Sequence, residues 1–209
     1  MKTDVILISS NGEAMENALA QADLVTNYKQ LNHKDALHLR LLTEELLGMM
    51  RSITGETKGK FWIEDENGEY RLHLAVETQM TAEKRERLLA ASSSGKNESA
   101  KGLMGRLRDF IDRGADKEAA RSSGISLPMD LLPRTSGSAP DWQGNEYWEW
   151  SMRNFEETIQ RQIQDSEKQS KAKEAWDELE KSVVAKVADD VKVSIRGRSV
   201  EMTIVKTMA

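Results

Sequence analysis

The chain has 209 residues, of which 38% are hydrophobic and 31% charged, and its formal net charge at pH 7 is -5. This size and composition are typical of one globular domain, or of one domain with a large insertion. The acidic balance argues against a nucleic-acid partner, because no block of Lys and Arg with interleaved aromatic residues is present in the sequence. Cysteine is absent, which excludes disulfides, thiolate zinc sites and cysteine nucleophiles.

Membrane and metal signals are weak along the whole sequence. No apolar run approaches the roughly 20 residues that a membrane span needs. The N-terminal stretch MKTDVILISSNG has too short an apolar segment for a secretory signal. The three histidines lack metal-ligand spacing, so no histidine-based metal site is predicted. We therefore predict a cytoplasmic protein that does not associate with a membrane.

The first predicted elements are a strand and two helices. The apolar run Asp4–Ser9 predicts a short strand. Residues 13–28 carry apolar side chains at helical spacing and predict an amphipathic helix. A second helix is predicted to begin after Asn32, a residue suited to an N-cap, and to end at Gly55.

A hairpin and two further helices are predicted next. Apolar residues alternate on both sides of Asn67-Gly68, the pair that favours a type I′ turn, so residues 59–78 predict two antiparallel strands. Residues 81–95 predict a short helix that runs into a small-residue loop, and residues 100–114 predict another helix.

The second half of the chain begins with an irregular segment. Residues 115–147 contain all three prolines together with many Gly and Ser residues, which predicts an excursion or lid. A long polar helical tract is predicted at about 148–187, and alternating strands around Arg196-Gly197-Arg198 predict a closing hairpin. Strands at both ends of the chain predict one domain over 1–209 with an insertion at about 115–175. The predicted class is α+β, a two-layer sandwich whose mixed, mostly antiparallel sheet is covered by helices on one face.

Two adjacent carboxylates interrupt the apolar pattern of the stretch LLTEELLGMMRSITG. At about 100° per residue, Glu45 falls beside the apolar stripe of the helix and Glu44 falls on the solvent side. The stripe consists of Leu39, Leu42, Leu46, Met49, Met50 and Ile53. A carboxylate at the edge of a core needs a partner. Glu45 is therefore either a salt-bridge or cap residue, or a general base or metal-shell residue at the mouth of a cleft.

Together, the helix, the hairpin and a later glycine-rich loop resemble the GHKL (histidine-kinase-like) ATPase superfamily, and within it the anti-sigma-factor and histidine-kinase-like ATPase domains. The resemblance covers about 4–114 and the closing hairpin. The family's helix carries Glu, two apolar residues, any residue and Asn, and the stretch ELLGM matches all but the Asn. The resemblance implies that Glu45, or Glu44 in the other register, positions the attacking water. Met49 or Gly48 then occupies the Asn position, and neither offers the side-chain oxygen that Mg²⁺ requires.

Two further motifs of the family bind the nucleotide. Its base-reading Asp-x-Gly-x-Gly follows the hairpin; this chain has VETQMT there, which implies Glu77 or Thr78 as the adenine contact, without the two glycines. Its glycine-rich lid leads into a helix N-terminus, where backbone N–H groups favour phosphate. The stretch SSSGKNESAKGLMGRL looks like that lid. The implied nucleotide-binding residues of the lid are Gly95, Lys96, Asn97, Gly102, Leu103 and Gly105.

The resemblance implies a Bergerat-type ATPase fold and an ATP-binding signalling protein, anti-sigma-factor-like, with weak or no Mg²⁺-dependent hydrolysis. Its implied partners are the nucleotide and a regulatory protein, and a homodimer is compatible with it. The alternative is a non-catalytic protein-interaction module on the same scaffold with a collapsed nucleotide pocket. A third interpretation, an unrelated α/β sandwich, stays open because two of the three motifs are incomplete.

Aromatic residues gather in the second half of the chain. Trp142, Trp148, Trp150 and Trp176 lie in or after the proline-bearing segment. Such a cluster indicates either a partner surface or anchors that hold a loop to its own domain. Phe155, Ile159 and Ile163 follow at a spacing of four, so the polar tract is expected to pack through a few apolar anchors only.

Overall fold

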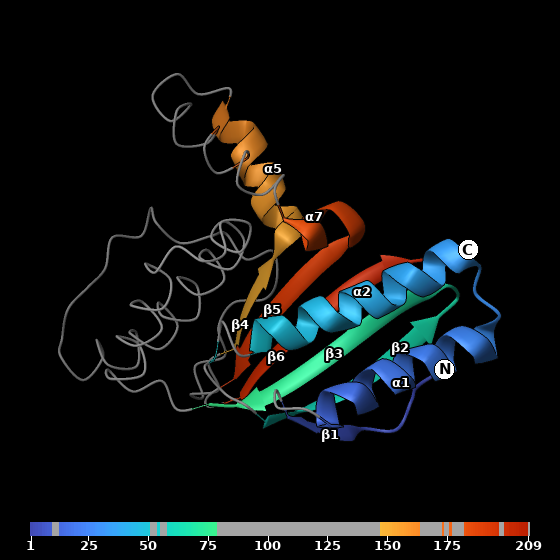
Figure 1. The fold of residues 1–209 in the computed structure, drawn as a ribbon. Coiled ribbons are helices and arrows are strands. Elements are labelled where there is room, and N and C mark those ends of the chain that lie inside the picture. The colour runs from blue at the N-terminus through green and yellow to red at the C-terminus, as the bar shows by residue number, and fades with distance from the viewer. Residues whose placement is uncertain are drawn as a thin grey trace.

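The computed structural model describes residues 1–9, 13–50, 54, 58–78, 147–163, 173, 176, 182–196 and 199–208. They form an α+β fold of two layers, in which a six-stranded sheet is covered by helices (Figure 1). The elements in chain order are β1 (Ile6–Ser9), α1 (Glu13–Lys29), α2 (His33–Met49), β2 (Lys58–Glu66), β3 (Glu69–Glu77), β4 (Tyr147–Ser151), α5 (Met152–Ile163), α7 (Val183–Val187), β5 (Asp190–Arg196) and β6 (Ser199–Thr207).

The two N-terminal helices confirm their predictions. Asn32 caps α2, since the backbone N–H of Asp35 donates to its side-chain oxygen at 3.0 Å. The α-helical stretch ends at Met49, with Met50 as its cap residue, and the predicted stop at Gly55 lies outside the described residues. The predicted helices over 81–95 and 100–114 also lie outside them.

The hairpin of β2 and β3 has the predicted tight turn. Asn67 and Gly68 both have positive φ, 54° and 86°, as a type I′ turn requires. The backbone N–H of Gly68 donates to the Asp65 carboxylate at 3.1 Å, which holds the turn. This two-residue turn places Trp62 opposite His73 in the ladder.

The sheet order is β1-β2-β3-β6-β5-β4, and every pairing among the described strands is antiparallel. The mixed sheet that we predicted is therefore wrong for these strands. The closing hairpin of β5 and β6 joins the first hairpin through β3 and β6, from Glu69 opposite Thr207 to Glu77 opposite Ser199. No parallel pair is needed to join the two hairpins, because each hairpin reverses the direction of the chain and β3 pairs antiparallel with β6.

Strand β4 corrects another prediction. Residues from Trp148 on were predicted to begin a long helix, but Tyr147–Ser151 is an edge strand paired with β5, and helix α5 begins only at Met152. The buried Trp150 packs on the core and its ring lies 6.0 Å from the ring of Phe155 in α5. Burial of this indole outweighs the local helical pattern. The strand lies inside the predicted insertion and belongs to the sheet.

Tryptophan anchoring is confirmed at the two positions whose side chains are described. Trp150 is buried in the main core, and Trp176 packs against the buried Ile159 of α5 together with Phe155 and Ile163. The side chain of Trp148 and the whole of Trp142 lie outside the described set.

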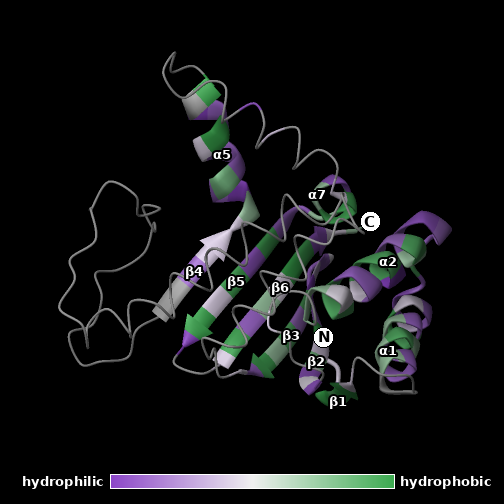
Figure 2. Ribbon diagram, turned by 60° about the vertical axis from the view of Figure 1, so that its left-hand side comes forward, coloured by the Kyte–Doolittle hydropathy of each residue, from purple (hydrophilic) through white to green (hydrophobic). Residues whose placement is uncertain are grey.

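Apolar and polar side chains alternate along the strands, so the sheet has an apolar face covered by helices and a more polar open face. Figure 2 shows this alternation as apolar and polar bands along β5 and β6. The covered face carries Phe61, Ile63, Leu72, Leu74, Met202 and Ile204, all fully buried. Their partners on α2 include four residues of the predicted stripe, Leu39, Leu42, Leu46 and Met49, with Met50 just beyond the helix. Among the helices that the structure describes, none is both long enough and apolar enough to cross a membrane.

Candidate functional site

Helix α2 lies diagonally on the sheet, with α1 on one side and α7 on the other (Figure 1). The Met50 sulfur at its C-terminal end would come within 3.1 Å of a Cβ atom placed on Gly59, and so would the Leu74 side chain. Glycine at this position lets the helix end approach the sheet closely. The C-terminal end of α2 is thereby held over the start of β2 and the end of β3.

The flank of α2 that faces α1 is held by ion pairs. Arg40 donates to the Asp23 carboxylate of α1 at 2.8 Å and lies 3.6 Å from the Glu44 carboxylate, one turn along α2. Thr43 and Leu47 on the same side are buried. Glu44, predicted as one of two candidate catalytic carboxylates, is thus placed in a partly exposed, paired position that stabilises the two-helix layer.

Glu45 lies on the opposite flank of α2, about 100° around the helix from Glu44. Its side chain is half-buried, and burial raises the pKa of the carboxyl above its ordinary value, with the neighbouring Glu44 charge as a second cause. Within the part of the chain that the structure describes, no cation and no hydrogen-bond donor meets this carboxylate. Glu45 therefore holds a proton more readily than a solvated Glu, a property suited to proton transfer.

The residues at the family's metal position supply no oxygen ligand. Met49, one turn after Glu45, is 1% exposed and belongs to the hydrophobic core. Gly48 is exposed and faces open space. Over the described ranges, no group of three or more His, Asp or Glu residues could hold a metal ion.

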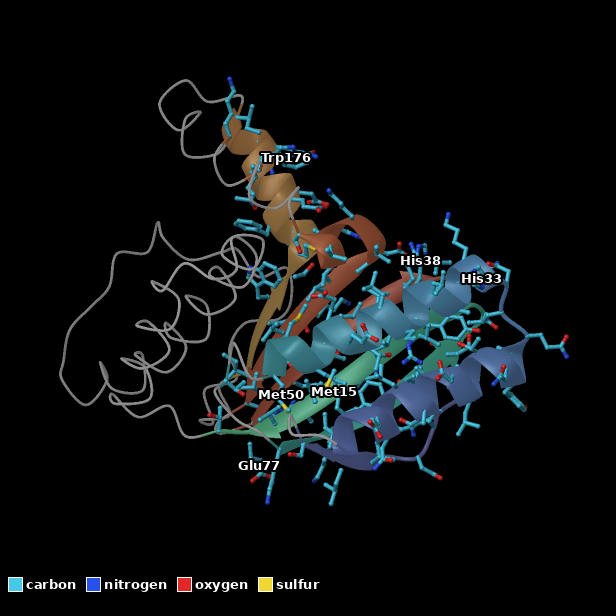
Figure 3. All side chains as sticks on the ribbon, viewed as in Figure 1. Met15, His33, His38, Met50, Glu77 and Trp176 are labelled. Atoms are coloured by element: carbon cyan, nitrogen blue, oxygen red, sulfur yellow. The ribbon has the colours of Figure 1, made fainter. Side chains whose placement is uncertain are left out.

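The end of β3 separates the two candidate adenine-contacting residues. Glu77 follows His73 and Ala75 in the alternation of the open face, where it lines a hollow of about 330 Å³ with Lys58 and Lys60. Thr78, the next residue, is buried. Figure 3 shows Glu77 and Met50 at the same end of the sheet. Thr78 therefore lies at the end of the sheet that α2 covers, whereas Glu77 points away from Glu45.

The phosphate-binding candidates lie in one stretch of chain. Gly95, Lys96, Asn97, Gly102, Leu103 and Gly105 all fall outside the described residues. The described residues of the candidate site are therefore Glu45, Met49 and Thr78.

A polar cluster on the open face was missed by the sequence analysis. The rings of Trp62 and His73 stack with 4.7 Å between centroids and 1° between planes. The indole N–H of Trp62 donates to Glu64 at 3.1 Å, and the Nδ1 atom of His73 lies 3.0 Å from Glu201 and 3.2 Å from Thr203. These groups contact one another across three strands and form a ladder of cross-strand pairs, in which the buried His73 Nε2 atom has no hydrogen-bond partner.

The signal for this ladder was present in the sequence. A two-residue turn at Asn67-Gly68 sets Trp62 opposite His73, so the turn type alone predicts that these two residues face each other. The contribution of Glu201 and Thr203 depends on the long-range pairing of β3 with β6. That half of the cluster required the tertiary structure.

No family model, no curated protein and no solved structure matches this chain. The resemblance to histidine-kinase-like ATPases remains a prediction from the sequence motifs. Any functional assignment therefore depends on those motifs and on the geometry of α2 and the end of β3.

Proposed function

We propose that the protein is a nucleotide-binding regulatory protein of the histidine-kinase-like ATPase type, which binds ATP with weak or no Mg²⁺-dependent hydrolysis. The observation that carries the proposal is Glu45, a half-buried carboxylate without a counter-ion among the described residues. It lies on the flank of α2 that faces away from α1. An uncompensated carboxylate is unfavourable at the edge of a core, so a functional role explains the presence of Glu45 better than a contribution to stability does.

In this proposal each residue has a defined chemical task. Glu45 lies beside the terminal phosphate, where a carboxylate with a raised pKa accepts a proton from an attacking water. The Thr78 hydroxyl, both donor and acceptor, contacts the edge of the adenine ring. The lid residues, Lys96 above all, supply an ammonium group and backbone N–H groups to the phosphates.

The buried Met49 supports the loss of metal dependence. Mg²⁺ takes oxygen ligands in near-octahedral geometry, and a thioether in the core offers none. Without the metal, the charge that develops on the phosphates is stabilised only by the lid, so hydrolysis is slow. The two-layer fold with helices on one face of an antiparallel sheet supports a Bergerat-type scaffold. Location in the cytoplasm and a regulatory protein partner belong to the same proposal.

A second candidate function is a non-catalytic protein-interaction module on the same scaffold. Met49 favours it, since it is fully buried at the position where the family holds its metal ligand, and the next residue, Met50, is fully buried too. In that case the core has closed over the pocket, and Glu45 is a remnant at its margin.

Calorimetric titration of the full chain with ATP and with ADP, each with Mg²⁺ and with EDTA, separates the two candidates. For the first, we expect a Kd of micromolar order that EDTA does not change. Lys96→Ala should weaken binding by about tenfold or more, because a charge-assisted contact to phosphate is lost. Thr78→Val keeps the shape of the side chain and should weaken binding of ATP and ADP equally.

Matched variants of the two glutamates test the role of Glu45. Glu45→Gln should leave nucleotide affinity within a few-fold and lower any residual hydrolysis, whereas Glu44→Gln, one residue away on the flank that faces α1, should change neither. Absence of heat and of a thermal shift at millimolar nucleotide would contradict nucleotide binding and leave the interaction module.

A further inference from the structure

The open face of the sheet has a hollow of about 330 Å³ at the end where β3 finishes. Side chains from four strands line it, namely Leu7 of β1, Lys58 and Lys60 of β2, Ala75 and Glu77 of β3, and Ser199 of β6. Leu7, which is 76% exposed, forms an apolar outer wall. Helix α2 and Glu45 lie over the other face of the sheet, so the hollow is separate from the nucleotide candidate site.

A small side chain leaves this part of the open face unfilled. Earlier along β2 and β3, the stacked rings of Trp62 and His73 cover the face. The next residue of β3 on the same face is Ala75, which stands opposite Lys60 on one side and Glu201 on the other. An alanine methyl group cannot fill the space between two long side chains. The hollow is therefore a consequence of alanine at this position.

The two lysines of the hollow differ from other cations of the same face. Lys2 lies 2.9 Å from Glu64, and Arg71 lies within ion-pair distance of two glutamates. Among the described residues, no carboxylate lies within ion-pair distance of Lys58 or Lys60. Their ammonium groups are therefore available to an external anion.

The spacing of the two lysines favours a doubly charged anion. Lys58 and Lys60 are two residues apart on β2, so they point to the same face with Cα atoms roughly 6–7 Å apart. Two flexible lysine stems at this spacing can meet at one group between them. A phosphate with two negative charges compensates both ammonium groups, whereas a carboxylate compensates one.

A carboxylate and a hydroxyl lie on the other side of the hollow. Glu77 and Ser199 stand opposite each other in the ladder of β3 and β6. Glu77 has no ion pair within the part of the chain that the structure describes. A carboxylate accepts hydrogen bonds and repels a phosphate, so the part of a ligand that meets Glu77 has to be a donor. Hydroxyl groups attached to the phosphate meet this requirement.

We propose that the hollow binds a small phosphate ester that carries hydroxyl groups. Its phosphate lies between Lys58 and Lys60, and a hydroxyl group donates to Glu77. Leu7 and Ala75 contact its carbon atoms. Inorganic phosphate shares only the contact with the lysines. Because the ammonium groups are exposed, binding is sensitive to salt and its Kd is of millimolar order.

Backbone amide NMR shifts of the full chain test the site during titration with glycerol 3-phosphate and with inorganic phosphate. The titrations are run at constant ionic strength and about pH 7.5, where the phosphate group of the ester carries two charges. We expect saturable shifts at Gly59 and Ala75, with a lower Kd for glycerol 3-phosphate. Absence of saturable shifts up to about 20 mM of either compound overturns the proposal.

Variants of the lysines identify the phosphate contact. Lys58→Gln and Lys60→Gln should each weaken binding of both compounds by about threefold or more, because one charge-assisted contact is lost. Lys192→Gln removes an exposed lysine of the same face, opposite Thr203 in the ladder, and is the matched control that should change neither Kd. Circular dichroism checks that each variant is folded. Equal effects of Lys60→Gln and Lys192→Gln would overturn the assignment of the phosphate contact.

Variants of β3 test the rest of the site. Glu77→Gln should tighten binding of inorganic phosphate, since a like charge is removed, and should reduce the preference for glycerol 3-phosphate. Ala75→Tyr keeps every charge and fills the hollow, so it should weaken binding of both compounds. Equal affinity of the wild type for the two compounds would overturn the role of Glu77. Unchanged affinity of Ala75→Tyr would overturn binding in the hollow.

Discussion

The two flanks of helix α2 carry the same kind of residue in opposite circumstances. Glu44 lies on the α1 flank, partly exposed and 3.6 Å from Arg40, which also donates to Asp23 of α1. Glu45, its neighbour in the chain, lies half-buried on the other flank without a counter-ion in the described part of the structure. One step of about 100° around a helix separates a stabilising carboxylate from a destabilising one.

The comparison shows why a pair of acidic residues cannot be judged from its sequence alone. A solvated carboxylate beside an arginine contributes a little stability and needs no other explanation. A desolvated carboxylate lowers stability unless a ligand or partner compensates it. The second flank is therefore the better place to look for function, and three substitutions on α2 can contradict or refine that view.

The largest effect is expected for Met49→Asn, which places an amide where the core holds a thioether. Because Met49 is fully buried, the substitution both removes apolar burial and desolvates the amide, and should lower the free energy of unfolding by about 2–5 kcal/mol. Urea unfolding of this variant measures the loss. Met49→Leu, which conserves volume, should lose less than about 1.5 kcal/mol. A loss for Met49→Asn no larger than for Met49→Leu would mean that position 49 reaches solvent and that a pocket opens there.

A smaller effect is expected for Arg40→Gln on the flank facing α1. The change removes the pairs with Asp23 and Glu44, both partly exposed, and should lower the free energy of unfolding by about 0.5–1 kcal/mol. Unfolding in low and in high salt measures it, and the difference from wild type should shrink in high salt because ions screen exposed charges. A difference that is unaffected by salt would assign the loss to packing of the arginine stem.

The smallest effect, of opposite sign, is expected for Glu45→Gln. Burial raises the pKa of Glu45 in the folded protein above its ordinary value of 4.5, so the folded state loses stability as the pH rises above that value. Removing the charge should raise Tm near neutral pH by about 1–2 °C, since solvent limits the penalty for a half-buried group. The gain should disappear below about pH 4, where the carboxyl is protonated in both states.

Thermal unfolding of wild type, Glu45→Gln and Glu44→Gln at about pH 4 and at neutral pH tests this prediction. Glu44→Gln is the control and should lower Tm slightly near neutral pH, because it removes a favourable pair with Arg40. A loss of stability for Glu45→Gln near neutral pH would show that the carboxylate has a stabilising partner. That result would contradict the assignment of the Glu45 flank of α2 as a functional site.

Predictions from local pattern succeeded where the determining residues are neighbours in the chain. The Asn67-Gly68 turn, the Asn32 cap and the described part of the apolar stripe, up to Met50, depend on contacts within a few residues, and all three have the expected geometry; Ile53 lies outside the described residues. The same approach gave a wrong prediction for β4. Trp150 is held in a strand by the core and by β5, which lies about forty residues further along the chain.

The candidate site was only partly accessible from the sequence. Helical spacing placed Glu45 at the margin of the core, and the structure agrees; Glu44, expected in solvent, is partly exposed and lies 3.6 Å from Arg40. The sequence pattern did not place Glu77 on the open face and Thr78 in a buried position, because these placements depend on the pairing of β3 with β2 and β6. The exposure of Leu7 on the outermost described strand was also unpredicted, since the exposure of an edge strand depends on the order of strands in the sheet.

The sequence by itself determined the helices α1 and α2, the two hairpins and the face that each buries, because side-chain periodicity and turn chemistry act over short chain distances. The tertiary structure decided how the hairpins join, that β4 is a strand, and which flank of α2 stays without a partner. The join of the hairpins depends on pairings between residues more than a hundred positions apart, such as Glu77 with Ser199, and strand β4 depends on its pairing with β5, about forty positions away. No local pattern specifies such a pairing, since many registers satisfy the same alternation until the whole core is packed.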